Sequence, residues 1–203
     1  MTIALPKGRI AKEVLDIFKK IFNEDFEFEN RKLILKKAGF TFLNVRNWDV
    51  AVYVQKQAAD IGVVGYDVIT ELKSDVLELM DLGLGKCRVS VGGIKGDESY
   101  KHKTEIKVAS KLANIAKDYF SKKGIPAEVI KLNGSIELAP LVGLSDVIVD
   151  IVETGSTLRE NGLEEKEVIL HSSARLIANK NSFLTKKPQI LELVEKIKEV
   201  HGA

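Results

Sequence analysis

The chain has 203 residues, of which 45% are hydrophobic and 30% charged, with a formal net charge of +2. At roughly 100–200 residues per domain, this length predicts one large domain or two small ones. The nearly balanced charge argues against a dedicated nucleic-acid-binding protein, which would carry a strong basic surplus. A single cysteine, Cys87, excludes an internal disulfide framework and a multi-cysteine metal cluster, and it is typical of a reducing compartment.

No part of the sequence has the character of a membrane span or an export signal. No apolar run approaches the ~18 residues that a span requires. Residues 2–7 predict a short strand that ends at Pro6, not a basic stretch followed by a long apolar region. We therefore expect a soluble, cytoplasmic protein that does not bind membranes.

Segments of strand and helix character alternate along the first half of the chain. After the first strand, apolar residues recur at helical spacing from Ile10 to Phe22 and predict an amphipathic helix. Phe26 and Phe28 alternate with charged residues over 24–30, which predicts an edge strand or hairpin arm. A short helix is expected over 49–56, and further strands are expected over 41–45, 59–65, 76–82 and 88–94.

The same alternation continues in the second half. A helix over 112–123 is stopped by Gly124 and Pro126, and a closing amphipathic helix over 188–200 has proline in its first turn. A further helix is expected over 136–142, and strands are expected over 106–109, 128–132, 147–151, 167–170 and 174–178. This pattern predicts an α/β architecture with mainly parallel sheets.

The two sets of β-α units follow each other without a low-complexity linker. This arrangement predicts two α/β lobes joined by more than one chain crossing, near residues 87–95 and 170–180. We expect lobe I to comprise residues 1–90 and 175–203, and lobe II to comprise residues 91–174. The central cleft between two such lobes is the default ligand site.

The richest chemical pattern follows the strand over 147–151. Thr154, Ser156 and Thr157 surround Gly155 at a strand-to-helix turn, where backbone N–H groups and hydroxyls converge in a way that suits a phosphate. Asp150 and Glu153 are suited to accept hydrogen bonds from sugar hydroxyls. The segment therefore predicts a site for a ribose 5-phosphate. The alternative is an ordinary capped helix, with Thr154 or Thr157 as the cap.

Basic residues supply a second pattern. Lys7 and Arg9 follow the first strand at its carboxyl end, where open sheets bind ligands, and Arg31 precedes another apolar segment. Each is also compatible with a basic surface turn. The glycine-rich residues 83–86 fit neither a Walker loop nor a dinucleotide fingerprint and predict a turn. The three histidines are scattered without metal-ligand spacing.

A longer set of residues resembles the signature of the ATP phosphoribosyltransferase family. The matching residues, in order and spacing, are Glu137, Gly143, Ser145, Ile148, Asp150, Ile151, Thr154, Gly155, Thr157 and Leu158. The segments 5–9, 31–33, 58–62, 65–68, 79–83 and 134–144 also look like that family, in its order. The resemblance covers nearly the whole chain.

The resemblance implies a two-lobed fold similar to type II periplasmic binding proteins, with the active site in the cleft. The family condenses ATP with 5-phosphoribosyl 1-diphosphate, giving N1-(5-phosphoribosyl)-ATP and diphosphate in the first step of histidine biosynthesis. Its Thr-Gly-x-Thr loop holds the 5-phosphate of the donor. Carried over, that loop comprises Thr154, Gly155, Ser156, Thr157 and Leu158, with Asp150 and Glu153 near the ribose.

The implied reaction assigns roles to the basic residues. Adenine N1 has no proton to lose, so catalysis should depend on alignment and on stabilising the departing diphosphate. Arginine binds phosphate oxygens bidentately, which favours Arg9 and Arg31 as catalytic residues, with Lys7 assisting. Mg²⁺ should arrive chelated by the diphosphate, so no dedicated protein ligands for a metal are expected. Position alone suggests Asp67, Ser135 and Glu137 for ATP binding.

The chain ends directly after its closing helix, which resembles the short form of the family. Short-form members assemble with a separate regulatory subunit similar to histidyl-tRNA synthetase, so we expect a hetero-oligomer. Two other interpretations stay open at this point. One is a purine- or pyrimidine-type phosphoribosyltransferase, which usually has two adjacent acids at the strand end, and the other is a non-catalytic two-lobed binding protein.

Overall fold

The computed structural model describes residues 1–202, which form two compact units. Unit 1 comprises Met1–Gly85 and Ser173–Ala203, and unit 2 comprises Lys86–Ser172. We expected the chain to leave the first lobe after residue 90 and to return after residue 174, whereas the compact units divide after residues 85 and 172. The difference arises because β6 (Cys87–Ile94) and β10 (Leu163–Ser172) pair with each other over their whole length, inside unit 2.

Unit 1 contains a six-stranded sheet in the order β2-β3-β1-β4-β11-β5. Strand β1 runs parallel to β3 and β4, whereas β2 and β11 run antiparallel to their neighbours. The strands of this sheet are β1 (Thr2–Pro6), β2 (Ile34–Lys37), β3 (Phe40–Val45), β4 (Ile61–Gly65), β5 (Leu77–Asp81) and β11 (Ala174–Ala178).

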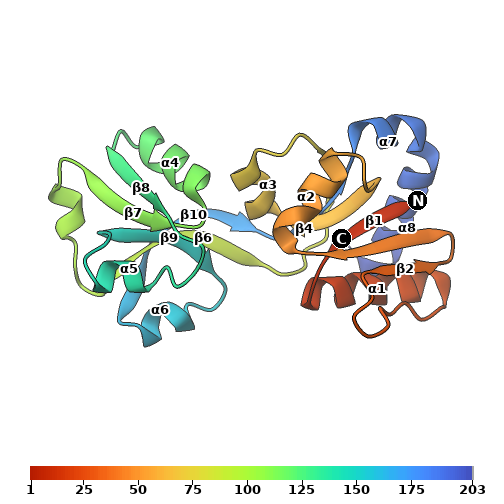
Figure 1. The fold of residues 1–203 in the computed structure, drawn as a ribbon, viewed down its shortest axis with the longest axis horizontal. Helices are drawn as coiled ribbons and strands as arrows, with labels where there is room; N and C mark the ends of the chain where they lie inside the picture. The colour runs from red at the N-terminus through yellow and green to blue at the C-terminus, as the bar shows by residue number, and fades with distance from the viewer. Residues whose placement is uncertain (203) are drawn as a thin grey trace. The chain divides into compact units, whose positions relative to one another are not determined.

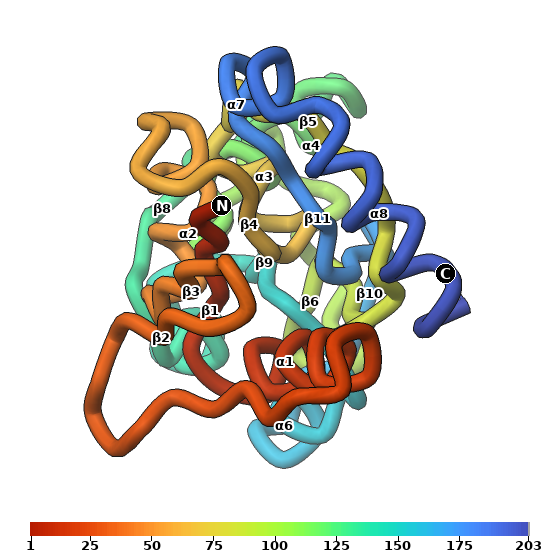
Figure 2. The backbone as a smooth tube through the Cα atoms, turned by 90° about the vertical axis from the view of Figure 1, so that its right-hand side faces the viewer, coloured from red at the N-terminus to blue at the C-terminus, as the bar shows by residue number. Residues whose placement is uncertain are grey.

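Helices cover both faces of the unit 1 sheet. Successive side chains of a strand point to opposite faces, so Ile3 and Leu5 join one core while Ala4 joins another. Figure 2 shows α1 and α8 on one side of β1 and α2 on the other. The helices of this unit are α1 (Arg9–Phe22), α2 (Asn47–Gln55), α3 (Tyr66–Leu72), α7 (Lys180–Thr185) and α8 (Lys187–His201).

The expected edge strand over residues 24–30 does not form. This segment is irregular, and the edge strand of the sheet is β2, four residues further along the chain. Phe26 is only 7% exposed because its ring packs edge-on against Phe18 and Phe42, with ring centroids 5.8 and 5.6 Å away. The alternating phenylalanines therefore reflect anchoring of a loop to the core, not the two-residue period of a strand.

Unit 2 contains a five-stranded sheet in the order β10-β6-β9-β7-β8 (Figure 1). Besides β6 and β10, its strands are β7 (Ile106–Ser110), β8 (Ala127–Lys131) and β9 (Val147–Val152). Residues Ile148 and Val152 of β9 pack on one face of the sheet with side chains from α5 and α6. The helical segments of this unit are η1 (Ser99–His102), α4 (Ala113–Lys122), α5 (Leu138–Leu141) and α6 (Ser156–Glu160).

The expectation of mainly parallel sheets is wrong. Across the described residues, four strand pairings are parallel and five are antiparallel. The main reason is the double crossing of the chain, and the hairpin of β2 and β3 adds one more antiparallel pairing. Strand β6 begins unit 2 and β10 ends it, so the two run in opposite directions side by side, and β11 then inserts between β4 and β5, against both.

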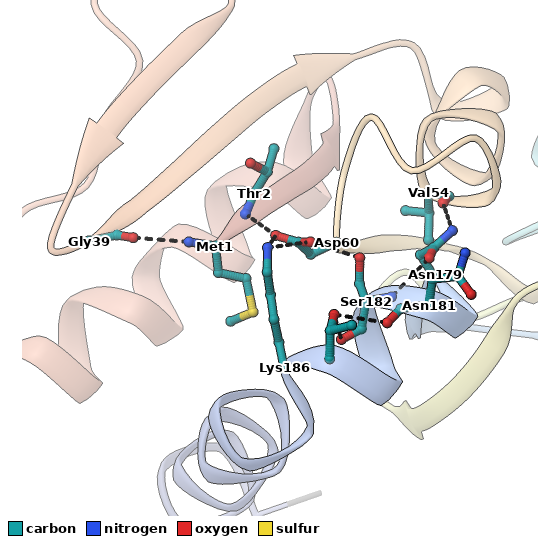
Figure 3. Close-up of polar contacts among 10 residues, drawn as sticks. Met1, Thr2, Gly39, Val54, Asp60, Asn179, Asn181, Ser182 and Lys186 are labelled. Atoms are coloured by element: carbon teal, nitrogen blue, oxygen red, sulfur yellow. Dashed lines mark hydrogen bonds and ion pairs between the residues drawn. The ribbon is translucent and has the colours of Figure 1, made fainter.

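A buried carboxylate connects the two ends of the chain within unit 1 (Figure 3). Asp60, just before β4, is 8% exposed and accepts a hydrogen bond at 2.8 Å from the backbone N–H of Thr2. The hydroxyl of Ser182 and the ammonium of Lys186 donate to the same carboxylate, each at 2.8 Å. Asp60 thus joins β1 and β4 to α7 and to the residue before α8.

No helix in the described part of the chain combines the length and the apolar character that a membrane crossing requires.

Candidate active site

A hollow of about 320 Å³ lies in unit 2 where β9 ends and α6 begins. It is lined by Glu137 and by every residue from Asp150 to Leu158. All seven residues predicted to bind the phosphoribosyl donor are therefore neighbours around one cavity. Glu137, predicted for ATP binding, lies in the same lining.

Asp150 reaches this hollow from the buried strand β9. Side chains alternate along a strand, so Asp150 lies on the same face as Ile148 and Val152, under α5 and α6. Its carboxylate accepts a hydrogen bond at 2.8 Å from the N–H of Ile151, the next residue. A partly buried carboxylate at the rim of a cavity is available to accept hydrogen bonds from ligand hydroxyls.

The surroundings of Asp150 favour its protonated form. Burial raises the pKa of Asp150 above its ordinary value, and the negative charge of Glu137 raises it further. The hydrogen bond from Ile151 and the positive charge of Lys111 act in the opposite direction and only partly offset this. A carboxyl group with a raised pKa beside a second carboxyl group, in a cavity, is typical of functional sites.

The loop at 153–157 is here called the phosphate loop, after the ligand that the sequence predicts for it, and all of its residues line the hollow. Gly155 has φ 75°, a left-handed conformation that glycine adopts without steric cost. The hydroxyl oxygens of Thr154 and Ser156 lie 3.0 Å apart. The alternative interpretation, a helix capped by Thr154 or Thr157, is met in part. The N-cap of α6 is Gly155, which has no side chain, but the hydroxyl of Thr154 accepts a hydrogen bond at 3.3 Å from the N–H of Ser156, the first residue of the helix.

The remaining predicted residues lie outside the lining of this hollow. Lys7 follows β1 and donates its backbone N–H to the carbonyl of Val45 at 2.8 Å, and Arg9 is the first residue of α1. The side chains of Lys7, Arg9 and Arg31 are exposed, and all three belong to unit 1. Ser135 belongs to unit 2, is exposed and has φ 50°.

Asp67, the fourth predicted residue of unit 1, is buried with 4% exposure in the first turn of α3. A Cβ on Gly65 would lie 2.3 Å from the Oδ1 atom of Asp67. Gly65 therefore leaves the space that the Asp67 carboxylate occupies. In this conformation Asp67 offers little surface to a ligand.

Two residues that were not predicted from the sequence contact the phosphate loop. Arg159 donates from Nη1 to the carbonyl of Thr154, and Arg88 donates from Nη1 to the carbonyl of Glu153, each at 3.1 Å. Arg159 follows the predicted loop closely and could have been suspected. Arg88 lies 65 residues from Glu153 in the sequence, so no local pattern connects them.

No group of three or more His, Cys, Asp or Glu side chains among residues 1–202 could hold a metal ion.

Most of the chain matches a known protein family. Residues 46–199 match the family model described as "HisG: ATP phosphoribosyltransferase". The chain belongs to the ATP phosphoribosyltransferase family. A protein named ATP phosphoribosyltransferase from Sulfurovum sp. (strain NBC37-1) is 61% identical over 200 residues, covering 98% of this chain and 97% of that one. A protein of the same name from Campylobacter fetus is 58% identical and covers 98% of each chain.

Solved structures agree with this family and with the predicted fold. The structure titled "ATP phosphoribosyl transferase (HisG:HisZ) complex from Thermotoga maritima" matches with a TM-score of 0.86 and 34% identity, covering 100% of this chain and 98% of that one. The periplasmic aliphatic sulphonate binding protein SsuA from Escherichia coli matches with a TM-score of 0.63 at 10% identity, covering 99% and 72% of the chains. The latter match shows the fold alone.

These findings confirm the predicted family and the predicted α/β fold, which is similar to that of periplasmic binding proteins. They also confirm the predicted activity, in which the enzyme transfers a phosphoribosyl group to ATP in the first step of histidine biosynthesis. A purine-type transferase and a non-catalytic binding protein are thereby excluded as alternatives.

Proposed function

We propose that the hollow lined by residues 150–158 holds the phosphoribosyl donor while ATP condenses with it. One observation supports this assignment above all. The predicted donor-binding residues follow one another along β9 and the phosphate loop, and all of them line one cavity. Backbone N–H groups of the loop and the hydroxyls of Thr154, Ser156 and Thr157 would bind the 5-phosphate. Asp150 and Glu153 would accept hydrogen bonds from the ribose hydroxyls.

The chemical step requires no general base. Adenine N1 carries a lone pair and no proton, so it attacks the anomeric carbon directly while the bond from that carbon to diphosphate breaks. The electron pair of this bond leaves with the diphosphate. Stabilising this developing charge should supply most of the catalysis.

Arg9 and Arg31, assisted by Lys7, are the proposed catalytic cations. All three side chains are exposed, so they present their donors outward instead of burying them in the core of unit 1. A guanidinium binds two phosphate oxygens at once and therefore suits diphosphate better than an ammonium does. Ser135 and Glu137 are the accessible members of the set proposed for ATP, which also includes the buried Asp67.

Mg²⁺ is proposed to enter as part of the substrate, bound to the diphosphate of the donor. Mg²⁺ prefers substrate phosphates and water to a cage made of protein ligands. The carboxylates of Asp150 and Glu137 are oxygen ligands of the right kind at the same hollow, but two carboxylates do not form a resident metal site. Because both substrates are intracellular metabolites, we place the reaction in the cytoplasm.

A separate regulatory subunit similar to histidyl-tRNA synthetase is the proposed partner, in a hetero-oligomer. Support comes from the Thermotoga maritima structure, which is a HisG:HisZ complex and whose matching chain is 34% identical to this one and covered to 98%.

A substitution in the phosphate loop tests the donor site. Thr157→Val removes a hydroxyl from the hollow while keeping the shape of the side chain, so the KM for 5-phosphoribosyl 1-diphosphate should rise about ten-fold with a smaller effect on kcat. Formation of the adenine adduct would be followed by ultraviolet absorbance, with a pyrophosphatase added to pull the reaction. Thr104→Val, an exposed threonine of the same unit outside the hollow, is the matched control. An unchanged donor KM in Thr157→Val would refute the assignment.

A further inference from the structure

The phosphate loop is held from outside the hollow by two guanidinium groups. Arg88 donates to the carbonyl of Glu153 and Arg159 donates to the carbonyl of Thr154, both at 3.1 Å. Neither arginine is among the residues that line the hollow. They therefore contact the backbone of the loop without occupying the space available to a ligand.

Arg88 is itself fixed by a bidentate ion pair. Its Nε and Nη2 atoms donate to the two carboxylate oxygens of Glu165, at 2.6 and 2.5 Å. The hydroxyl of Ser90 donates to the same carboxylate at 2.7 Å. The two bonds to Glu165 fix the guanidinium between β6 and β10. Its remaining nitrogen, Nη1, is thereby directed at the carbonyl of Glu153. Lysine has no planar fork and could not make this set of bonds.

The direction of these two carbonyls determines the direction of the next two N–H groups. A trans peptide is planar, so its carbonyl and its N–H point in opposite directions, and no cis peptide bond occurs among residues 1–202. The N–H of Thr154 therefore points away from Arg88, and the N–H of Gly155 points away from Arg159. Successive N–H groups on one side of such a turn form a concave anion site.

Gly155 and Arg159 also fit each other sterically. A Cβ at Gly155 would lie 3.0 Å from Nη1 of Arg159, in addition to the strain that φ 75° imposes on any residue with a side chain. The glycine therefore serves two purposes, because it permits the turn and it admits the guanidinium that holds the turn.

We propose that Arg88 and Arg159 are positioning residues for the 5-phosphate of the donor. They orient the peptides after Glu153 and Thr154 so that the N–H groups of the phosphate loop face the phosphate. This inference rests on the function proposed above, and it adds two residues that act on the substrate only through the backbone of the loop.

Binding of substrate fragments to the purified full chain tests this role. Ribose 5-phosphate carries the 5-phosphate without the leaving group, and inorganic diphosphate represents the leaving group alone. In Arg159→Met and Arg88→Lys, the Kd for ribose 5-phosphate, measured by titration calorimetry, should rise about ten-fold, while the Kd for diphosphate stays unchanged. An equal loss for both ligands would overturn the proposal, because it would indicate a general effect of charge or folding.

Lysine substitutions distinguish positioning from simple positive charge. Arg159 makes one bond to the loop, so Arg159→Lys should restore ribose 5-phosphate binding to within about two-fold. Arg88→Lys should not keep normal ribose 5-phosphate binding, because a single ammonium cannot hold Glu165 bidentately and also reach the carbonyl of Glu153. Full binding in Arg88→Lys would contradict the proposal. If Arg88→Lys fails to fold, the exposed Arg159→Met decides the question alone.

Two further variants complete the design. Lys123→Met removes a cation of the same unit that pairs with Glu167 instead of the loop, and it should leave both Kd values unchanged. If Thr157→Val leaves ribose 5-phosphate binding unchanged, the proposed donor site fails. If Thr157→Val weakens binding while Arg159→Met and Arg88→Lys do not, the donor site stands and only the positioning role is wrong.

Discussion

Asp150 is a partly buried residue whose environment makes its ionised form unfavourable for stability. Burial and the charge of Glu137 raise its pKa above the ordinary value of 3.8, so the folded chain holds the proton more tightly than the unfolded chain does. Ionisation therefore costs stability. The stabilising contribution is complete below pH 3.8 and is lost as the pH rises through the raised pKa.

Asp150→Asn should accordingly stabilise the protein by about 1 kcal/mol at pH 7 while weakening donor binding. The amide keeps the size of the side chain and removes the charge that burial disfavours. Unfolding in urea, monitored at pH 7 and at pH 4, provides the measurement, because the gain should shrink at the lower pH. A gain of the same size at both values would contradict this account of Asp150.

Arg9 and Arg31 are the residues on which the chemical step is proposed to depend. Arg9→Ala and Arg31→Ala should each lower kcat by about 10²-fold, which is typical for the loss of one preorganised charge contact in an active site. Arg46→Ala, which removes another exposed arginine of unit 1, is the matched control and should leave kcat unchanged. Normal turnover in either test variant would remove that residue from the mechanism.

At the scale of elements, the carboxylate of Asp60 holds the C-terminal helices onto the sheet of unit 1 (Figure 3). Burial by itself would raise the pKa of Asp60. Hydrogen bonds from Lys186, Thr2 and Ser182 outweigh burial and lower the pKa below its ordinary value. The stability that Asp60 contributes is therefore present above pH 3.8 and is lost as the pH falls through the lowered pKa.

Asp60→Asn should lower the free energy of unfolding at pH 7 by about 3 kcal/mol, because it leaves the surrounding donors without an ionised acceptor. In the same variant, the free energy of unfolding should fall less steeply as the pH is lowered below neutral. Asp75→Asn is the control, since Asp75 pairs at the surface with Lys180 of α7, with side chains 68% and 52% exposed. That variant should change stability by no more than about 0.5 kcal/mol. Equal effects of the two substitutions would contradict the role assigned to burial.

At the scale of the whole molecule, each unit has a sheet and a hydrophobic core of its own. The proposed donor site lies in unit 2, whereas the proposed catalytic cations lie in unit 1. Both crossings of the chain are made between strands, at residues 85–86 and 172–173. The fold of these two units is similar to that of periplasmic binding proteins.

The resemblance to the short form of the family also implies feedback inhibition by histidine, and we expect that inhibition to reside in the proposed regulatory subunit. Adenine-adduct formation by the isolated chain should therefore be insensitive to histidine, and adding the partner should confer inhibition. Co-purification and size-exclusion chromatography would establish the complex before the assay. Full histidine sensitivity of the isolated chain would contradict the proposed division of labour.

The sequence by itself determined the features that depend on neighbouring residues. Periodicity and turn residues predicted α1, β9 and α8 to within a few positions. The predicted donor-binding residues line one hollow because 150–158 form one strand end and one turn, so adjacency in sequence becomes adjacency in space. Family membership followed from the spacing of the same local motif.

Only the tertiary structure decided the contacts between distant segments. Phe26 lies in a loop because rings on α1 and β3 bury it, which its own two-residue pattern cannot reveal. Arg88 meets Glu165 across 77 residues, and Asp60 meets Lys186 across 126. Strand direction was decided in the same way, since the pairing of β6 with β10 depends on where the chain returns. These contacts form only when the sheets assemble, because their energy comes from burial and pairing between segments that no local pattern connects.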